Sequence, residues 1–206
     1  MKNIFKFLLI SLVFTGVLSS CDDKTDLPYV DKPIFKGNFT DGFTGWTTYS
    51  ETGSQVWTID PTYGNPNPNN GSDFPPNPCA KISGYSGGNN ANVDWLISPA
   101  QDLSKYTEAS IAFDNAFKFT GPVIEVYVSR DYSGAGSPSV SGVNWTKIEG
   151  ATLSTGEYKY AFSGLLNISN YTGPGNETVY IAFKYTSTTL ESSTWEIDNV
   201  KVYGSN

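Results

Sequence analysis

The side chains available for chemistry are restricted in this chain. It has 206 residues, no histidine and only two cysteines, Cys21 and Cys79. Without histidine, Ser-His-Asp and Cys-His catalysis and His-ligated zinc are excluded. Two cysteines are too few for a thiolate zinc site or a disulfide framework. Any chemistry must therefore come from carboxylates, amides, hydroxyls and aromatic rings.

Two carboxylates near the end of the sequence alternate along a predicted strand. Glu196 and Asp198 share one face, because alternate strand residues point the same way. Glu196-Ile197-Asp198 resembles the start of the Glu-x-Asp-x-x-Glu motif of laminarinase-like glycosidases, but Lys201 stands where the acid/base carboxylate belongs. Retaining hydrolysis needs two carboxyl groups about 5–5.5 Å apart, and the sequence offers no second one to assign. We expect no enzymatic activity.

The predicted loops contain the residue types that bind sugars. Aromatic faces stack on the C–H patches of a sugar ring, and amides pair with its hydroxyls. The candidate ligand-binding residues are Tyr63, Asn65, Tyr85, Tyr132 and Trp145. The alternative is structural, because asparagine and glycine also build turns. The other tryptophans, Trp46, Trp57, Trp95 and Trp195, fit a core better.

The first residues of the chain have the pattern of a lipoprotein signal. Lys2 and Lys6 precede an apolar run over residues 7–18, which is shorter than the ~20 residues of a membrane span. Leu18-Ser19-Ser20-Cys21 resembles the bacterial lipobox, which implies that residues 1–20 are removed and that Cys21 is acylated. The alternative is an ordinary signal peptide with an incidental cysteine.

An acidic tether over residues 21–34 begins at the predicted lipidation site, Cys21. Asp22, Asp23 and Asp26 resemble the surface-export signal of Bacteroidetes lipoproteins. That resemblance implies an outer-membrane protein that faces the cell exterior and touches the membrane through its acyl anchor only. The alternative is a solvated acidic linker.

From residue 35 to 206 the pattern is that of an all-β domain. Runs rich in Val, Ile, Tyr, Phe and Thr alternate with turn residues, and the only helical hint is a single turn at 103–106. In the run 123–129, Tyr127 lies on a wetter face and Val126 on a dry one. The net charge of −7 argues against nucleic acid as a partner. Many short strands predict a sandwich or barrel.

Several motifs in this domain occur together in a known family. They are Asn38-Phe39-Thr40-Asp41-Gly42-Phe43-Thr44-Gly45-Trp46, Asp94-Trp95-Leu96-Ile97-Ser98-Pro99 and Trp195-Glu196-Ile197-Asp198-Asn199-Val200. Their order resembles the choice-of-anchor J domain of Bacteroidetes surface proteins, which is related to cleaved-adhesin domains. The resemblance implies a jelly-roll β-sandwich similar to carbohydrate-binding modules, with an adhesive or accessory role.

The same resemblance implies a structural Ca²⁺ between the first and last strands. The matching carboxylates are Asp41 and Asp198, with Asp94 as a weaker third ligand. The alternative is that Asp198 caps a turn or pairs with a lysine. The resulting hypothesis is a non-catalytic surface module that binds a glycan or glycoprotein, with docking onto another surface protein as the competing role.

Overall fold

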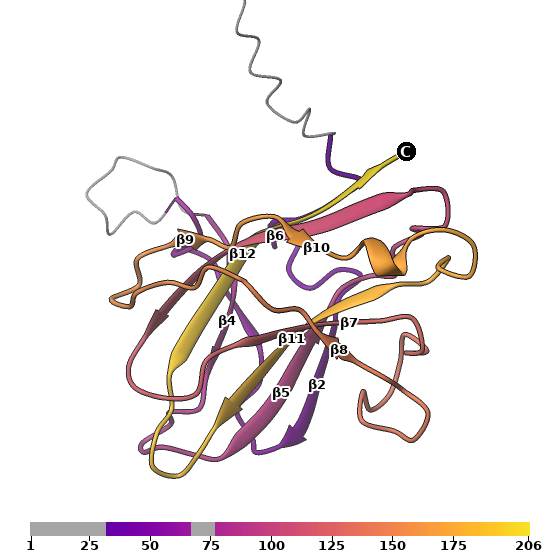
Figure 1. Ribbon diagram of the computed structural model, residues 1–206. Helices are drawn as coiled ribbons and strands as arrows, with labels where there is room; N and C mark the ends of the chain where they lie inside the picture. Colours follow the sequence, from indigo (N-terminus) through magenta and orange to yellow (C-terminus); the bar gives the residue numbers. More distant parts are fainter. Residues whose placement is uncertain (1–31, 67–76) are drawn as a thin grey trace, which may run out of the picture.

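The computed structural model describes residues 32–66 and 77–206, whose strands form two antiparallel sheets (Figure 1). Sheet A has seven strands, in the order β10-β6-β12-β4-β3, with β1 paired to β12 and β9 to β6. Sheet B has five, in the order β2-β5-β11-β7-β8. The predicted all-β jelly-roll sandwich is confirmed.

The strands of sheet A are β1 (Phe35–Gly37), β3 (Thr58–Asp60), β4 (Cys79–Ser83), β6 (Glu108–Lys118), β9 (Ala161–Phe162), β10 (Leu166–Asn167) and β12 (Thr194–Ser205). Those of sheet B are β2 (Thr47–Thr52), β5 (Asn92–Ile97), β7 (Glu125–Ser129), β8 (Thr146–Lys147) and β11 (Tyr180–Ser187). A short 3-10 helix, η2, covers Ser169–Tyr171. The single turn expected at 103–106 is present as a hydrogen-bonded turn, in which Tyr106 N donates to Leu103 O at 3.2 Å.

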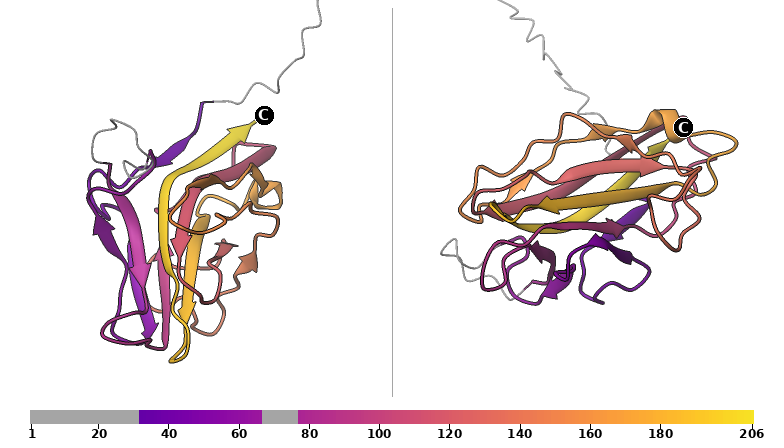
Figure 2. Two further views of the ribbon diagram at one scale, coloured as in Figure 1. Left: turned by 90° about the vertical axis from the view of Figure 1, so that its left-hand side faces the viewer. Right: turned by 90° about the horizontal axis from the view of Figure 1, so that it is seen from below.

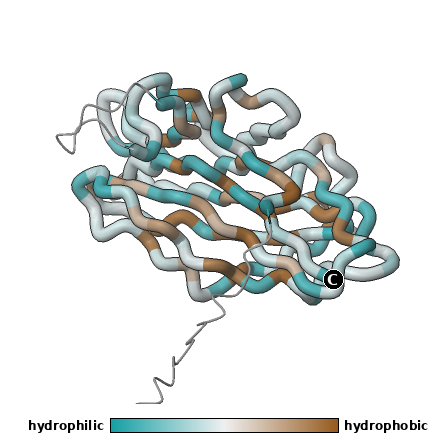
Figure 3. Tube along the Cα trace, turned by 90° about the horizontal axis from the view of Figure 1, so that it is seen from above, coloured by the Kyte–Doolittle hydropathy of each residue, from teal (hydrophilic) through white to brown (hydrophobic). Residues whose placement is uncertain are grey.

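The core lies between the sheets and is built from alternate residues of each strand. Figure 3 shows hydrophobic and hydrophilic positions alternating along the chain. Phe113 of β6 meets Phe183 of β11 edge to face across the two sheets, with ring centroids 5.0 Å apart. Phe117 stacks on Trp195 within sheet A at 4.7 Å. Val126 is buried in the core, as the alternation in β7 predicts.

The long strand β12 runs from one end of the sandwich to the other (Figure 2). Its first half pairs with β4 and its second half with β1, while β6 pairs along its other edge. The described chain therefore enters beside the C-terminus, and the β4–β5 and β11–β12 loops lie at the opposite end (Figure 1).

The predicted signal peptide and the acylated Cys21 lie outside the described residues. In the part of the chain that is described, no helix has the length and apolarity of a membrane span. Cys79 is fully buried in β4.

Candidate functional site

The outer face of sheet B carries a cluster of aromatic rings that we call the aromatic face. Its rings belong to Tyr49, Trp95, Tyr127, Tyr132, Trp145 and Tyr180. Trp95 of β5 points outward because its neighbour Leu96 points into the core. Its ring centroid lies 5.5 Å from that of Tyr127 and 5.3 Å from that of Trp145. Adjacent strands thus place their rings in one continuous cluster.

The loop between β7 and β8 folds over one end of the aromatic face. The Tyr132 hydroxyl donates to Gly136 O at 3.0 Å, and Trp145 Nε1 donates to Pro138 O at 3.0 Å. Tyr132 is only 3 % exposed, so its ring supports the loop and presents no free face. Trp145 is half-buried and keeps surface at the edge of the loop.

Charged side chains border the rings. Lys184 Nζ lies 5.1 Å from the centroid of the Trp95 ring. Glu125 accepts a hydrogen bond from the Tyr127 hydroxyl at 3.0 Å, and its other oxygen pairs with Lys147 Nζ at 3.0 Å. Burial opposes ionisation of Glu125, but Lys147 and Tyr127 together lower its pKa. The aromatic face therefore has half-buried rings beside a hydrogen-bond donor, Lys184, and a hydrogen-bond acceptor, Glu125.

A second polar network, the amide network, lies on the outer face of sheet A. Buried Asp198 accepts hydrogen bonds from Asn65 N and Asn77 Nδ2, both at 2.8 Å, and from Asn199 N at 2.7 Å. Asp114 faces it across the β6–β12 pair and accepts from the side chains of Asn65 and Asn199 at 2.9 Å. A bulge after Asp198 leaves Asn199 at φ 48°, which aims its amide at Asp114.

Burial raises the pKa of Asp198 to about 7, and the hydrogen bonds of the amide network offset part of the effect. Glu196, two residues earlier, is also enclosed, at 1 % exposure, and burial raises its pKa to about 7. Its Oε1 lies 3.6 Å from Lys81 Nζ, which makes a shorter contact of 2.9 Å with Asp60. The strand pattern thus correctly places Glu196 and Asp198 on one face, but loops cover that face.

The predicted metal ligands do not converge. Asp41 is exposed in the turn after β1, Asp94 is buried in sheet B, and Asp198 is buried in sheet A. Among the described residues, no group of three or more acidic or cysteine side chains could hold a metal ion. Moreover, both Asp198 oxygens face N–H donors, whereas Ca²⁺ takes oxygen ligands. The described residues do not fit the expected calcium site, and calcium binding remains a prediction to be measured.

The predicted ligand-binding residues fall in three places. Tyr132 and Trp145 lie together on the aromatic face. Tyr63 lies under Lys81, and Asn65 belongs to the amide network of sheet A. Tyr85 lies on the β4–β5 loop and is 61 % exposed. Of the pair on sheet B, Tyr132 is buried and Trp145 keeps exposed surface, and the other three predicted residues lie away from the aromatic face.

Sequence reasoning does not assign Tyr49, Trp95 or Lys184 to the aromatic face. The predicted wet face of the 123–129 run does place Tyr127 correctly. Trp95 is expected in a core and is indeed buried, at 3 % exposure, but in the cluster outside sheet B. The neighbouring Asp94 gives a misleading signal, because it shares the inward face of β5 with Leu96 and its polarity favours Trp95 as the core residue.

The chain is a β-sandwich of two antiparallel sheets, with a cluster of aromatic rings on the outer face of sheet B. The chain belongs to the family described as Domain of unknown function (DUF5017), whose model matches residues 79–204. No curated protein matches the chain in sequence.

Solved structures with the same fold include adhesin and carbohydrate-binding domains. The K1 cleaved adhesin domain of Lys-gingipain from Porphyromonas gingivalis W83 has a TM-score of 0.55 and 17 % identity, over 84 % of this chain and 98 % of that one. The K2 domain of the same protein gives 0.52 and 15 %, over 82 % and 98 %. TmCBM61, solved with β-1,4-galactotriose, gives 0.50 and 12 %, over 84 % and 99 %. At these identities the likeness establishes the fold.

Proposed function

We propose that the protein is a non-catalytic binding module that captures a glycan, or the glycan part of a glycoprotein, on its aromatic face. The observation that carries the proposal is the row of half-buried rings of Tyr127, Tyr49 and Trp145 around Trp95. Such rings supply flat apolar surface for sugar C–H patches, and Glu125 and Lys184 supply hydrogen-bond acceptors and donors at its border. The fold shared with adhesin and carbohydrate-binding domains is consistent with this role.

The proposal includes attachment to the outer membrane through acylated Cys21, with the domain facing the cell exterior. The described chain starts beside the C-terminus, so a tether entering there leaves the β4–β5 and β11–β12 loops at the far end (Figure 1). An anchor at that end leaves the aromatic face, on the side of the sandwich, open to solvent. The lipobox resemblance and the acidic residues after it support this part of the proposal.

A polysaccharide and host-glycan array tests the function. The protein is the chain from Asp22 onward, which lacks the acyl site and keeps every described residue. We expect saturable binding to a defined glycan that is lost in Tyr127→Ala and retained in Tyr203→Ala, a half-buried tyrosine on sheet A. Repeating the array with Ca²⁺ and with EDTA measures the predicted calcium dependence. A blank array from protein shown to be folded would contradict glycan capture.

A second candidate, docking onto another surface protein, is favoured by the far end of the sandwich. Leu190 is 83 % exposed at the tip of the β11–β12 loop. Asn89 Nδ2 on the neighbouring β4–β5 loop, which carries exposed Tyr85, donates to Leu190 O at 2.6 Å. Exposed apolar side chains on two joined loops suit a protein partner. Loss of cell-surface co-purification in Leu190→Ser, with glycan binding intact, would identify this role.

A further inference from the structure

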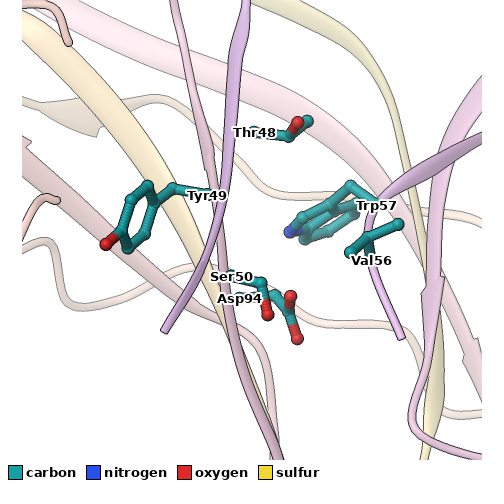
Figure 4. A pocket seen from close by; sticks show the side chains of 6 residues that line it. All are labelled: Thr48, Tyr49, Ser50, Val56, Trp57 and Asp94. Atoms are coloured by element: carbon teal, nitrogen blue, oxygen red, sulfur yellow. The ribbon is translucent and has the colours of Figure 1, made fainter. Parts of the chain in front are cut away.

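A small pocket opens at the edge of the sandwich, between β2 and the residues that precede β3 (Figure 4). Its volume is about 70 Å³, and it is lined by Thr48, Tyr49, Ser50, Val56, Trp57 and Asp94. The Tyr49 ring points away from the pocket toward the aromatic face, so this residue contributes backbone. Val56 is 49 % exposed at the mouth. We call this site the edge pocket.

Two polar side chains in the edge pocket are buried without partners. Asp94 is 1 % exposed and Trp57 is 4 % exposed. Within the described part of the chain, neither carboxylate oxygen of Asp94 nor Nε1 of Trp57 has a hydrogen-bond partner. The Ser50 hydroxyl donates to Thr52 O at 3.3 Å and also interacts with Asp94, where it offsets part of the rise in pKa that burial causes. Buried polar groups in folded proteins are nearly always paired, so an acceptor and a donor left open in one pocket indicate a ligand or ordered water.

The chemistry of the two open groups selects the ligand. An ionised carboxylate only accepts hydrogen bonds, whereas an indole N–H only donates. An ammonium group would satisfy Asp94 but has no acceptor for Trp57, and an anion would be repelled by Asp94. A hydroxyl group both donates and accepts, so it can satisfy Asp94 and Trp57 together. Val56 and the Trp57 ring add apolar surface that suits the C–H groups of a polyol.

We propose that the edge pocket binds a sugar residue, through neighbouring hydroxyls that donate to Asp94 and accept from Trp57 Nε1. The volume admits the hydroxyl-bearing edge of one ring, so the rest of the sugar lies outside the mouth between Thr48 and Val56. This site is separate from the aromatic face, and the inference does not rest on glycan capture there.

Nuclear magnetic resonance of the tryptophan indole groups tests the proposal. The chain from Asp22 onward is labelled with ¹⁵N and titrated with methyl β-galactoside, methyl β-glucoside and methyl α-mannoside. The Trp57 indole signal is assigned from its absence in Trp57→Phe. We expect at least one sugar to shift this signal saturably, whereas methylammonium chloride does not. Binding at the aromatic face instead shifts the Trp95 or Trp145 signals, so the two sites are scored independently.

Variants test whether the shift arises in the edge pocket. Val56→Trp fills the mouth, and Asp94→Asn removes the negative charge and replaces one acceptor oxygen with an N–H donor. Each substitution should weaken binding at least about tenfold. Val123→Trp is the matched control, because Val123 is also an exposed valine, at 57 %, and does not line the pocket. A folded protein whose Trp57 signal responds to none of the sugars shows that the pocket holds water only and overturns the proposal. An equal response in Val56→Trp, or to methylammonium, also overturns it.

Discussion

Asp94 is a carboxylate whose burial destabilises the folded protein at neutral pH. Burial raises its pKa from 3.8 to about 6. Between these two pH values the folded state therefore keeps a proton that the unfolded state has released. Stability therefore falls as pH rises through this window. We predict that Asp94→Asn is more stable than the wild type by up to about 3 kcal/mol above pH 7, and that the difference disappears below about pH 4.

Urea unfolding at the two pH values measures this difference. Asp41→Asn is the matched control, because Asp41 is exposed and the same substitution there removes a charge that is already in water. Wild type and variant carry the same other titrating groups, so the comparison isolates Asp94. An Asp94→Asn protein that is less stable at pH 8 would show that the carboxylate is paired with a cation in solution.

Asp198 differs from Asp94 in its contacts, because it accepts hydrogen bonds from N–H donors of three different residues. Asp198→Ala leaves the donors of Asn65, Asn77 and Asn199 without their acceptor. We predict a loss of roughly 2–4 kcal/mol in the free energy of unfolding, with faster hydrogen exchange at the Asn65 amide. Asp198→Asn should cost less, since it keeps one acceptor oxygen. A loss no larger than that of Asp41→Ala would contradict this role for the amide network.

At the scale of elements, the β7–β8 loop depends on Trp145 for its position. Its ring packs on Trp95, and its Nε1 donates to Pro138 O. We predict that Trp145→Ala costs about 2–3 kcal/mol and exposes the loop to proteolysis, whereas Trp145→Phe keeps the ring contact and costs about 1 kcal/mol. Val140→Ala is the control in the same loop, because Val140 is 51 % exposed. Equal cleavage rates in all three variants would show that the loop is held by other contacts.

The sequence predicts some strands well and misses others for physical reasons. The apolar runs that become β6, β7, β11 and β12 are recognisable because their buried faces alternate with polar ones. β2 reads Thr-Thr-Tyr-Ser-Glu-Thr, and at the edge of sheet B it buries too little to show a pattern. Cys79 and Lys81 lie on the outward face of β4, and loops distant in sequence cover that face. The aromatic face is missed in part for the same reason, because Trp95 and Trp145 meet only after folding.

At the scale of the molecule, the two outer faces of the sandwich differ in character. Sheet B displays rings with a few charges, whereas sheet A displays carboxylates and amides covered by loops. A sandwich with one aromatic and partly open side can bind there without disturbing the other. The covered polar side of sheet A holds Glu196 and Asp198, two of the buried carboxyl groups whose pKa values are raised.

Three buried carboxyl groups make the stability of the whole protein pH-dependent. Burial raises the pKa of Asp94 to about 6 and those of Glu196 and Asp198 to about 7. Each therefore holds a proton in the folded state above the pH at which the unfolded chain releases it. Stability contributed in this way is present at acid pH and is lost as pH rises to about 7, at up to about 1.4 kcal/mol for each unit of pKa shift.

Asp60 and Glu125 act in the opposite direction, because their pKa values are lowered and their contribution is lost in acid. We therefore predict that the melting temperature is highest near about pH 5 and falls toward about pH 8. Repulsion within a chain of net charge −7 adds to the fall. Glu196→Gln should flatten the profile and leave the Lys81–Asp60 contact of 2.9 Å in place. Circular dichroism melts across this range measure the effect, and a melting temperature that rises steadily to about pH 8 would show that these carboxyl groups ionise at ordinary values.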